Sequence, residues 1–199
     1  MQHTAIRIGP GDQGRRMSLA EFEHADGQEG HVYELSRGVV TVVDVPDRRH
    51  ALQLDAIRDQ LYAYKHSNPG RIHVVLPGSE CKILLHGLES ERHPDLAIYK
   101  LPPLDDEEDQ WATWIPEIVM EVVSRSSRHR DYEQKPDEYL QFGILQYWIL
   151  DAETQEMLVL RRFGGRWVRR VVRPPEVYKP RLLPGLEFDC GAVFRAAGA

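Results

Sequence analysis

The chain has 199 residues, of which 42% are hydrophobic and 28% are charged, and its formal net charge at pH 7 is −6. This size and composition fit one globular domain with a buried core. A membrane-spanning helix is excluded, because no run of about 18 apolar residues occurs. The negative charge argues against a protein that coats nucleic acid non-specifically.

The N-terminus lacks the apolar core of a secretory signal, and the only two cysteines, Cys81 and Cys190, lie far apart. We therefore expect a cytoplasmic protein without disulfide bonds. Basic residues nevertheless gather at four places, where each cluster either lines a nucleic-acid groove or is ordinary solvated surface charge. These are 48–50, 125–130, 161–162 and 169–170.

The first half of the chain begins with a glycine-rich segment, residues 1–16, which we expect to be a loose arm before a single domain over 17–199. Ser18 with Glu21 has capping-box spacing and predicts a short helix. Residues 31–45 predict a β-hairpin around Gly38, and the apolar spacing over 48–65 predicts a helix. Strands follow at 71–77, 81–87 and 95–100.

The second half begins with a loop over 101–114, which carries the acidic run Asp105 to Asp109. We then predict a buried strand at 116–124, a helix over 129–143, a strand at 146–151 and a hairpin over 157–172 around Gly164 and Gly165. Residues 182–194 close the chain with a short strand or helix. This order predicts an α/β fold, in which helices flank a mixed central sheet.

Glu121 stands out within the apolar strand PEIVMEVVS. A carboxylate buried among apolar neighbours costs several kcal/mol (roughly 3 to 5) unless it is paired, protonated or bound to a metal. The alternative is that the strand exposes Glu121 at an edge of the sheet. Apolar residues on both faces of the strand favour the buried position.

Asp95 follows Pro94 directly before another strand, so it is placed at the start of that strand. It is either a turn aspartate that accepts local backbone hydrogen bonds or a partner of Glu121. Two carboxylates on neighbouring strands suit Mg²⁺, which takes oxygen ligands and completes its octahedron with water and substrate phosphate. A nearby lysine then holds the phosphate or the attacking water.

A Pro-Asp pair and a strand carboxylate followed two residues later by lysine are the marks of the PD-(D/E)xK nuclease superfamily, but here that later position is Val123. Lys135 on the next helix borders the face formed by Tyr132, Pro136 and Tyr139, so it either leans over the sheet or extends to solvent. Pro136 directly after Lys135 disfavours a helical conformation at the lysine.

The wider pattern resembles the Uma-type restriction-endonuclease family within that superfamily, from about Met17 to Phe194. The strings that carry the resemblance are YELSRGVV, HPDLAIY, PEIVMEVVSRSSRHRDYEQKPDEYLQFGILQYWILD and LPGLEFD. In that family the lysine lies on the helix, in an Asp-x-x-x-Lys-x-x-x-Tyr arrangement that matches Asp131, Lys135 and Tyr139. His93 departs from the pattern, since glutamine or glutamate is expected before the Pro-Asp pair.

The resemblance implies a restriction-endonuclease-like fold and an endonuclease site in which Lys135 acts beside three carboxylates. Glu34, Asp95 and Glu121 would hold Mg²⁺ or Mn²⁺. The family pattern also matches His50 and Ser124, and we place five residues at the substrate: His50, Ser124, Arg128, Arg130 and Tyr139.

Two functions remain open from the sequence. The first is metal-dependent hydrolysis of phosphodiester bonds in nucleic acid, with DNA expected as the substrate. The second is a catalytically inactive module on the same fold that binds nucleic acid or protein, which the net charge and the acidic run favour. Because cutting two strands suits two-fold symmetry, we also expect a homodimer.

Overall fold

The computed structural model describes residues 6–43, 47–104 and 110–198. Its largest sheet has six strands in the order β12-β11-β10-β9-β8-β5, and only the pair β9–β10 is parallel. The strands are β5 (Val74–Pro77), β8 (Leu96–Tyr99), β9 (Ile118–Val122), β10 (Gln146–Asp151), β11 (Glu156–Phe163) and β12 (Arg166–Val172). The sheet is mixed, as the sequence predicted.

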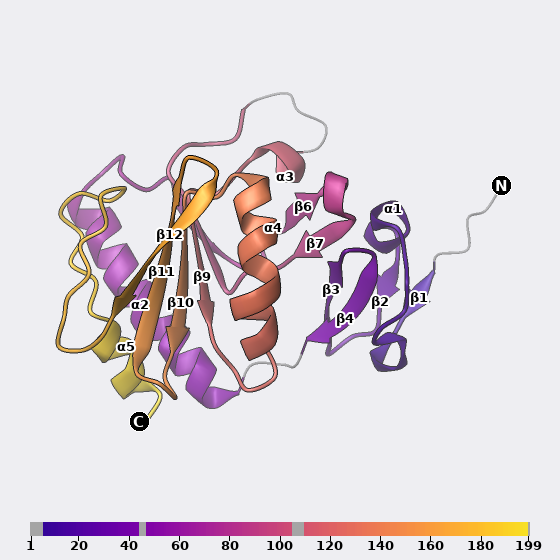
Figure 1. Ribbon diagram of the computed structural model, residues 1–199, viewed down its shortest axis with the longest axis horizontal. Coiled ribbons are helices and arrows are strands. Elements are labelled where there is room, and N and C mark those ends of the chain that lie inside the picture. The colour runs from indigo at the N-terminus through magenta and orange to yellow at the C-terminus, as the bar shows by residue number, and fades with distance from the viewer. Residues whose placement is uncertain (1–5, 44–46, 105–109, 199) are drawn as a thin grey trace.

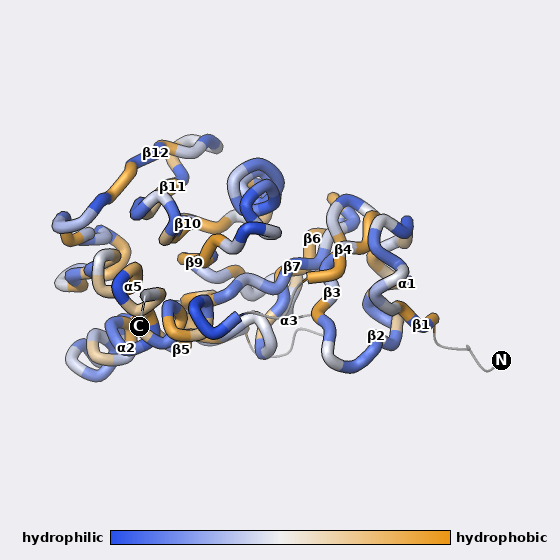
Figure 2. The backbone as a smooth tube through the Cα atoms, turned by 90° about the horizontal axis from the view of Figure 1, so that it is seen from below, coloured by the Kyte–Doolittle hydropathy of each residue, from blue (hydrophilic) through white to orange (hydrophobic). Residues whose placement is uncertain are grey.

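Helices cover both faces of this sheet (Figures 1 and 2). The long helix α2 (Arg48–Ser67) and the C-terminal helix α5 (Cys190–Ala196) lie on one face. On the other face lies α4 (Lys135–Phe142), which is preceded by a single π-helical turn, η3 (Arg130–Gln134). Within the described ranges, no helix combines the length and hydrophobicity needed to cross a bilayer.

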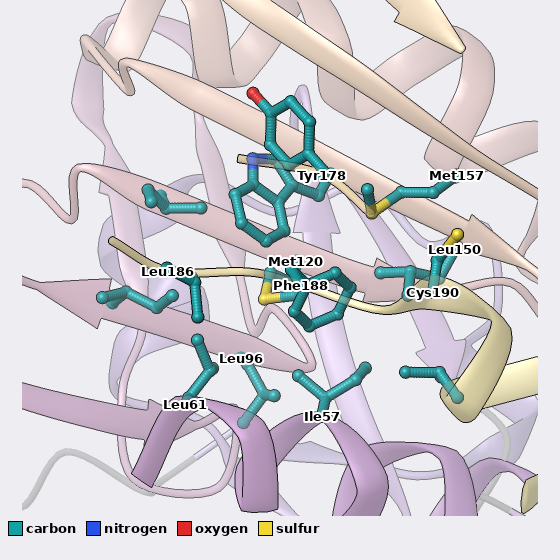
Figure 3. Close-up of a cluster of buried hydrophobic side chains, with 14 of the residues drawn as sticks. Ile57, Leu61, Leu96, Met120, Leu150, Met157, Tyr178, Leu186, Phe188 and Cys190 are labelled. Carbon is teal, nitrogen blue, oxygen red and sulfur yellow. The ribbon is translucent and has the colours of Figure 1, made fainter. Parts of the chain in front are cut away.

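Two apolar clusters hold the layers together. On the α2 side, Ile57 and Leu61 pack towards Leu96, Met120 and Phe188 (Figure 3). On the α4 side, a smaller cluster joins helix and sheet through Val119, Tyr139, Tyr147 and Ile149. Because side chains alternate along a strand, the odd-numbered residues of β9 face α4 and its even-numbered residues face α2.

A second, four-stranded sheet lies beside the first, in the order β4-β3-β7-β6 (Figure 1). Its strands are β3 (Val32–Ser36), β4 (Val39–Val43), β6 (Ile83–Leu85) and β7 (Ser90–Arg92), with the turn η2 (His86–Leu88) between the last two. The remaining elements are β1 (Arg7–Ile8), η1 (Pro10–Asp12), α1 (Leu19–Glu23), β2 (Asp26–Gly27) and α3 (Gln110–Thr113).

Most predicted elements are present. Ser18 caps α1 through the predicted capping box with Glu21, the β3–β4 hairpin turns at Arg37 and Gly38, and both cysteines are free and buried. The segment 182–194, predicted as a strand or helix, supplies most of helix α5. The acidic run Asp105 to Asp109 lies outside the described residues.

The structure differs from the sequence expectations at two places in the N-terminal half of the chain. Residues 6–16, expected to be part of a loose arm, are ordered, because β1 pairs in parallel with β2 and Arg16 bridges to Val39. Strand β7 was not predicted, because its sequence Ser-Glu-Arg carries no apolar alternation. All three of its residues are nevertheless buried. The hydroxyl of Ser90 accepts the backbone N–H of Arg37, Arg92 donates to Glu138 on α4, and Oε1 of Glu91 lies 2.9 Å from Nε2 of His93.

The π-helical turn ends directly before Lys135 and Pro136, the first two residues of α4. A proline has no N–H, and its ring crowds the carbonyl of the residue four positions earlier in an α-helix. Here Lys135 N–H donates to the carbonyl of Arg130, five residues back. The carbonyl of Asp131, which Lys135 would use in an α-helix, instead accepts a hydrogen bond from the buried Tyr147 hydroxyl at 3.0 Å. The wider turn thus leaves the helix unbroken.

Candidate active site

The antiparallel register of β8 and β9 brings Asp95 and Glu121 together. Leu96 pairs with Met120, so Asp95, one residue before β8, lies opposite Glu121. The backbone N–H of Asp95 points to Oε2 of Glu121 at 3.4 Å. Glu121 is only 3% exposed, so the prediction of a buried carboxylate on this strand is confirmed.

Asp95 is anchored through one carboxylate oxygen. Its Oδ2 accepts the backbone N–H of Val122 at 2.7 Å and lies 3.0 Å from Nε2 of His50, in the first turn of α2. Burial lowers the pKa of His50, but the hydrogen bond and charge of Asp95 outweigh this effect and raise that pKa above its ordinary value. His50 therefore fixes the orientation of Asp95.

Glu121 meets helix α4 through its other oxygen. Oε1 accepts the Tyr139 hydroxyl at 2.8 Å and lies 2.9 Å from Nζ of Lys135. Burial raises the pKa of Glu121 above its ordinary value, although Lys135 opposes the shift, and the charge of Asp95 raises it further. Glu121 thus sits where a cation stabilises its charged form.

Lys135 lies among three carboxylates, with Nζ 3.0 Å from Asp131 Oδ1, 2.9 Å from Glu121 Oε1 and 4.0 Å from Glu34 Oε1. Burial lowers its pKa, but the charges of Asp131 and Glu121 outweigh this and raise the pKa above its ordinary value. The lysine has helical backbone angles, φ −59° and ψ −35°. The expectation that Pro136 would disturb the helix at Lys135 was wrong, because the chain accommodates the proline after a π-helical turn and keeps Lys135 helical.

Glu34 on β3 belongs to a buried network that the sequence analysis missed. Its Oε2 accepts Nη1 of Arg92 at 2.9 Å, and its Oε1 accepts the backbone N–H of His93 at 3.1 Å. Arg92 also binds Glu138 through Nε at 2.6 Å. Burial raises the pKa of Glu34, but Lys135 and Arg92 reverse this and lower it to about 2. Glu34 is therefore a charged anchor whose two oxygens are both engaged.

Arg92 and Glu138 could hardly be predicted from the sequence, because a lone arginine two residues before a Pro-Asp pair does not show whether its side chain is buried. Both residues are fully buried. Asp131, which appeared only as part of the resemblance, is also buried, at 1% exposed, and pairs with Lys135.

These residues lie at one side of a cleft of about 720 Å³. Seven of the nine predicted site residues line it: Glu34, His50, Asp95, Glu121, Ser124, Arg130 and Lys135. Three arginines also line it: Arg58 from α2, Arg125 from the loop after β9, and Arg130 from η3. Carboxylates and arginines thus line the same cleft.

Of the other three residues predicted at the substrate, only Ser124 lines the cleft, whereas Arg128 and Tyr139 do not. Ser124 lines the cleft, with its hydroxyl accepting the backbone N–H of Ser127 at 3.1 Å. Arg128 instead pairs with Asp151 at 2.7 Å and with Glu153 at 2.8 Å, and it is not among the residues that line the cleft. Tyr139 is fully buried behind Glu121, so it positions that carboxylate and lies away from the cleft.

The site fits a hard divalent cation only in part. Among the described residues, no three His, Cys, Asp or Glu side chains are grouped to hold a metal ion. Asp95 and Glu121 do form a pair of oxygen donors that face one cleft. Mg²⁺ often takes one or two carboxylates and fills its other positions with water and substrate phosphate. The pair suits a cation that binds together with its substrate.

Comparisons with known proteins identify the family and the fold of the chain. Residues 19–191 match the family described as "Uma2: Putative restriction endonuclease". The fold is similar to that of "a putative nuclease belonging to DUF820" from Anabaena variabilis ATCC 29413, with a TM-score of 0.72 and 17% sequence identity. That similarity covers 91% of this chain and 99% of the other. No curated protein matches the chain.

Proposed function

This chain belongs to the Uma2 family, and from that premise we propose that it is a Mg²⁺-dependent endonuclease that hydrolyses phosphodiester bonds in DNA. One observation carries the proposal. Nζ of Lys135 lies 2.9 Å from Oε1 of Glu121, and Oε2 of Glu121 faces the backbone N–H of Asp95. These three residues line a cleft that is also lined by three arginines.

Asp95 and Glu121 would hold the cation, while Tyr139 and His50 fix the two carboxylates. A bound Mg²⁺ lowers the pKa of its water and offsets charge on the phosphoryl oxygens. Lys135 remains an ammonium at neutral pH because the surrounding carboxylates raise its pKa. It therefore donates hydrogen bonds to the attacking water or to the phosphate, and it does not act as the general base.

The arginines of the cleft would contact the phosphates that flank the scissile bond. Among the described residues, neither Arg58 nor Arg125 forms an ion pair. Arg130 donates a hydrogen bond of 3.2 Å to the carbonyl of Ser126, in the loop before η3. Guanidinium groups suit phosphate oxygens, because they present several N–H donors in one plane. The restriction-endonuclease description of the family supports DNA as the proposed substrate.

The test is a cleavage assay on plasmid and linear DNA with Mg²⁺ or Mn²⁺. We expect Asp95→Asn and Lys135→Met to lose activity by at least about 100-fold, the scale at which removing one group that stabilises transition-state charge acts. Asp137→Asn removes one exposed carboxylate of the same helix, only two residues from Lys135, and serves as the matched control. Isothermal titration with each cation, with and without DNA, follows the same variants.

Undiminished cleavage by Asp95→Asn would show that the site is elsewhere. If the wild-type protein binds DNA equally well in EDTA and never cuts it, the inactive binding module is the correct function instead. The ion pairs of Lys135 with three carboxylates would then be a structural cluster.

We also propose that the endonuclease acts as a homodimer, since two copies related by a two-fold axis place one site on each DNA strand. Light scattering gives the mass in solution directly. A dimer that makes double-strand breaks supports the proposal, whereas a monomer that only nicks plasmid contradicts it.

A further inference from the structure

A second cavity, of about 320 Å³, lies between the N-terminal elements and strand β7. It adjoins the active-site cleft, because four residues line both spaces: Val32, Gly78, Ser79 and His93. The shared wall is tight at Gly78, where a Cβ atom would lie 2.6 Å from the carbonyl oxygen of Pro94. The wall that the two cavities share therefore includes His93, two residues before Asp95.

The polar groups of this cavity include two buried atoms that the described residues leave without a hydrogen bond. They are Oε2 of Glu91 and the hydroxyl of Tyr33. The side chain of Glu91 is 9% exposed, and its other oxygen, Oε1, lies 2.9 Å from Nε2 of His93. Nζ of Lys82 lies 3.7 Å from Oε2, an ion-pair distance that is too long for a hydrogen bond. An unpaired buried acceptor costs free energy unless a ligand donates to it.

The charges of the cavity suit a neutral ligand. Glu23 and Glu91 are balanced by Lys82, which lies 3.0 Å and 3.7 Å from them, and by His93. Both ring nitrogens of His93 face acceptors, Nε2 towards Glu91 and Nδ1 towards the carbonyl of Gly78 at 3.0 Å. The excess of arginine lies in the neighbouring cleft.

The walls are also suited to a flat ring. Phe22, His31 and Tyr33 line the cavity, and the rings of His31 and Tyr33 have centroids 6.3 Å apart. Enzymes that act on nucleic acids often take an unstacked base into a pocket of aromatic side chains and read its edge with hydrogen bonds. A carboxylate is the usual acceptor for the amino group of cytosine.

We propose that this cavity binds one unpaired nucleobase next to the scissile phosphate and that Glu91 reads its exocyclic amino group. The inference rests on the proposed nuclease function for its substrate class. Cytosine presents an amino group to Glu91 Oε2. Thymine presents a single N–H between two carbonyl oxygens, which repel a carboxylate. The pocket therefore selects cytosine over thymine.

The experiment measures binding without catalysis, so that it is independent of cleavage. Fluorescein-labelled single strands of eight deoxycytidines or eight thymidines are titrated in EDTA, and Kd is read from fluorescence anisotropy. We expect the wild-type protein to bind the cytidine strand at least tenfold more tightly, because a buried acceptor discriminates strongly against a ligand that leaves it unpaired.

Glu91→Gln keeps an oxygen for His93 but presents an amide to the base, so its preference for cytidine should fall below about threefold. Tyr33→Phe removes only the hydroxyl and tests the cavity a second time, with a smaller expected loss. Asp137→Asn should keep the wild-type ratio. Thermal unfolding of each variant confirms that it is folded.

A wild-type ratio near one, a ratio that Glu91→Gln preserves, or no binding of either strand would each overturn the base pocket. These outcomes are separable from the nuclease proposal. Metal-dependent cleavage with no base preference leaves the active site standing and removes the pocket. If the protein never cleaves DNA but shows a base preference that Glu91→Gln removes, the base pocket is supported and the nuclease proposal is rejected.

Discussion

Four charged side chains at the centre of the site are almost completely buried: Glu34 is 2% exposed, Glu121 3%, Asp131 1% and Lys135 4%. Removing such charges from water costs free energy, and only their mutual pairing offsets that cost. The loss of one partner from a buried ion pair costs about 3 to 5 kcal/mol. The network contributes little net stability. It does hold Lys135 and Glu121 in one geometry before any substrate arrives, as a preorganised site requires.

His50 is expected to act on the metal through Asp95. Changing His50→Asn should weaken Mn²⁺ binding and DNA cleavage by about 10- to 100-fold, because groups that orient a ligand typically carry that much affinity. Titration calorimetry with DNA present measures the first effect. His66→Asn, at the exposed end of the same helix, is the control. Equal losses in both variants would point to helix damage.

Arg92 is expected to matter for stability more than for chemistry. Arg92→Met leaves Glu34 and Glu138 without their buried cation, and should lower the free energy of unfolding by about 3 to 5 kcal/mol. Urea denaturation measures this loss. Arg173→Met breaks an exposed ion pair with Glu156 and should cost at most about 1 kcal/mol. A similar small cost for Arg92→Met would contradict the buried network.

At the scale of elements, a strand register and a π-helical turn position the residues of the site. The register of β8 against β9 sets Asp95 opposite Glu121. The π-helical turn at Arg130–Gln134 sets Lys135 above the sheet, and such turns are frequent at functional sites. Within this turn, the Tyr147 hydroxyl satisfies the displaced carbonyl of Asp131.

Tyr147→Phe tests the role of this hydrogen bond. The change removes the hydroxyl donor and leaves the buried carbonyl of Asp131 unsatisfied, which should cost about 1 to 3 kcal/mol of unfolding free energy. If the turn aims Lys135, cleavage activity should also fall under conditions in which the variant remains folded. Tyr62→Phe, at an exposed position of α2, should change neither quantity. Full activity in a destabilised Tyr147→Phe would separate the turn from catalysis.

At the scale of the whole molecule, the chain is acidic, yet one cleft is lined by three arginines. The net charge of −6 disfavours non-specific attraction to DNA, while three arginines concentrate positive charge along one cleft. The fold allows this because α2, the loop after β9, and η3 converge beside the strand edge that carries Asp95 and Glu121. Binding should therefore be local and strongly dependent on salt.

The salt dependence can be measured directly. Each phosphate contact contributes about −0.9 to the slope of log K against log salt for duplex DNA. The double variant Arg125→Ala, Arg130→Ala should reduce that slope by about 2, with anisotropy titrations between 50 and 200 mM salt as the readout. Arg128→Ala, which removes an arginine paired with Asp151 and Glu153, should leave the slope unchanged. Equal slopes for all three proteins would place the DNA elsewhere.

Local sequence signals predicted much of the fold, because they depend on neighbours along the chain. The capping box at Ser18, the Arg37-Gly38 hairpin turn and the apolar spacing of α2 all gave elements that the structure contains. The same holds for Glu121, since a lone carboxylate in an apolar strand is conspicuous. Strand β7 escaped detection because the polar side chains of Ser90 and Arg92 are paired with residues distant in sequence.

The sequence by itself thus determined the mixed α/β fold, the family and the candidate residues Asp95, Glu121 and Lys135, because propensity, periodicity and motif are written in local order. Only the tertiary structure decided how these residues meet. The strand register, the π-helical turn that keeps Lys135 helical beside Pro136, and the buried partners Arg92 and Glu138 arise from contacts between segments up to about a hundred residues apart. Such contacts have no periodicity along the chain, so the folded packing alone specifies them.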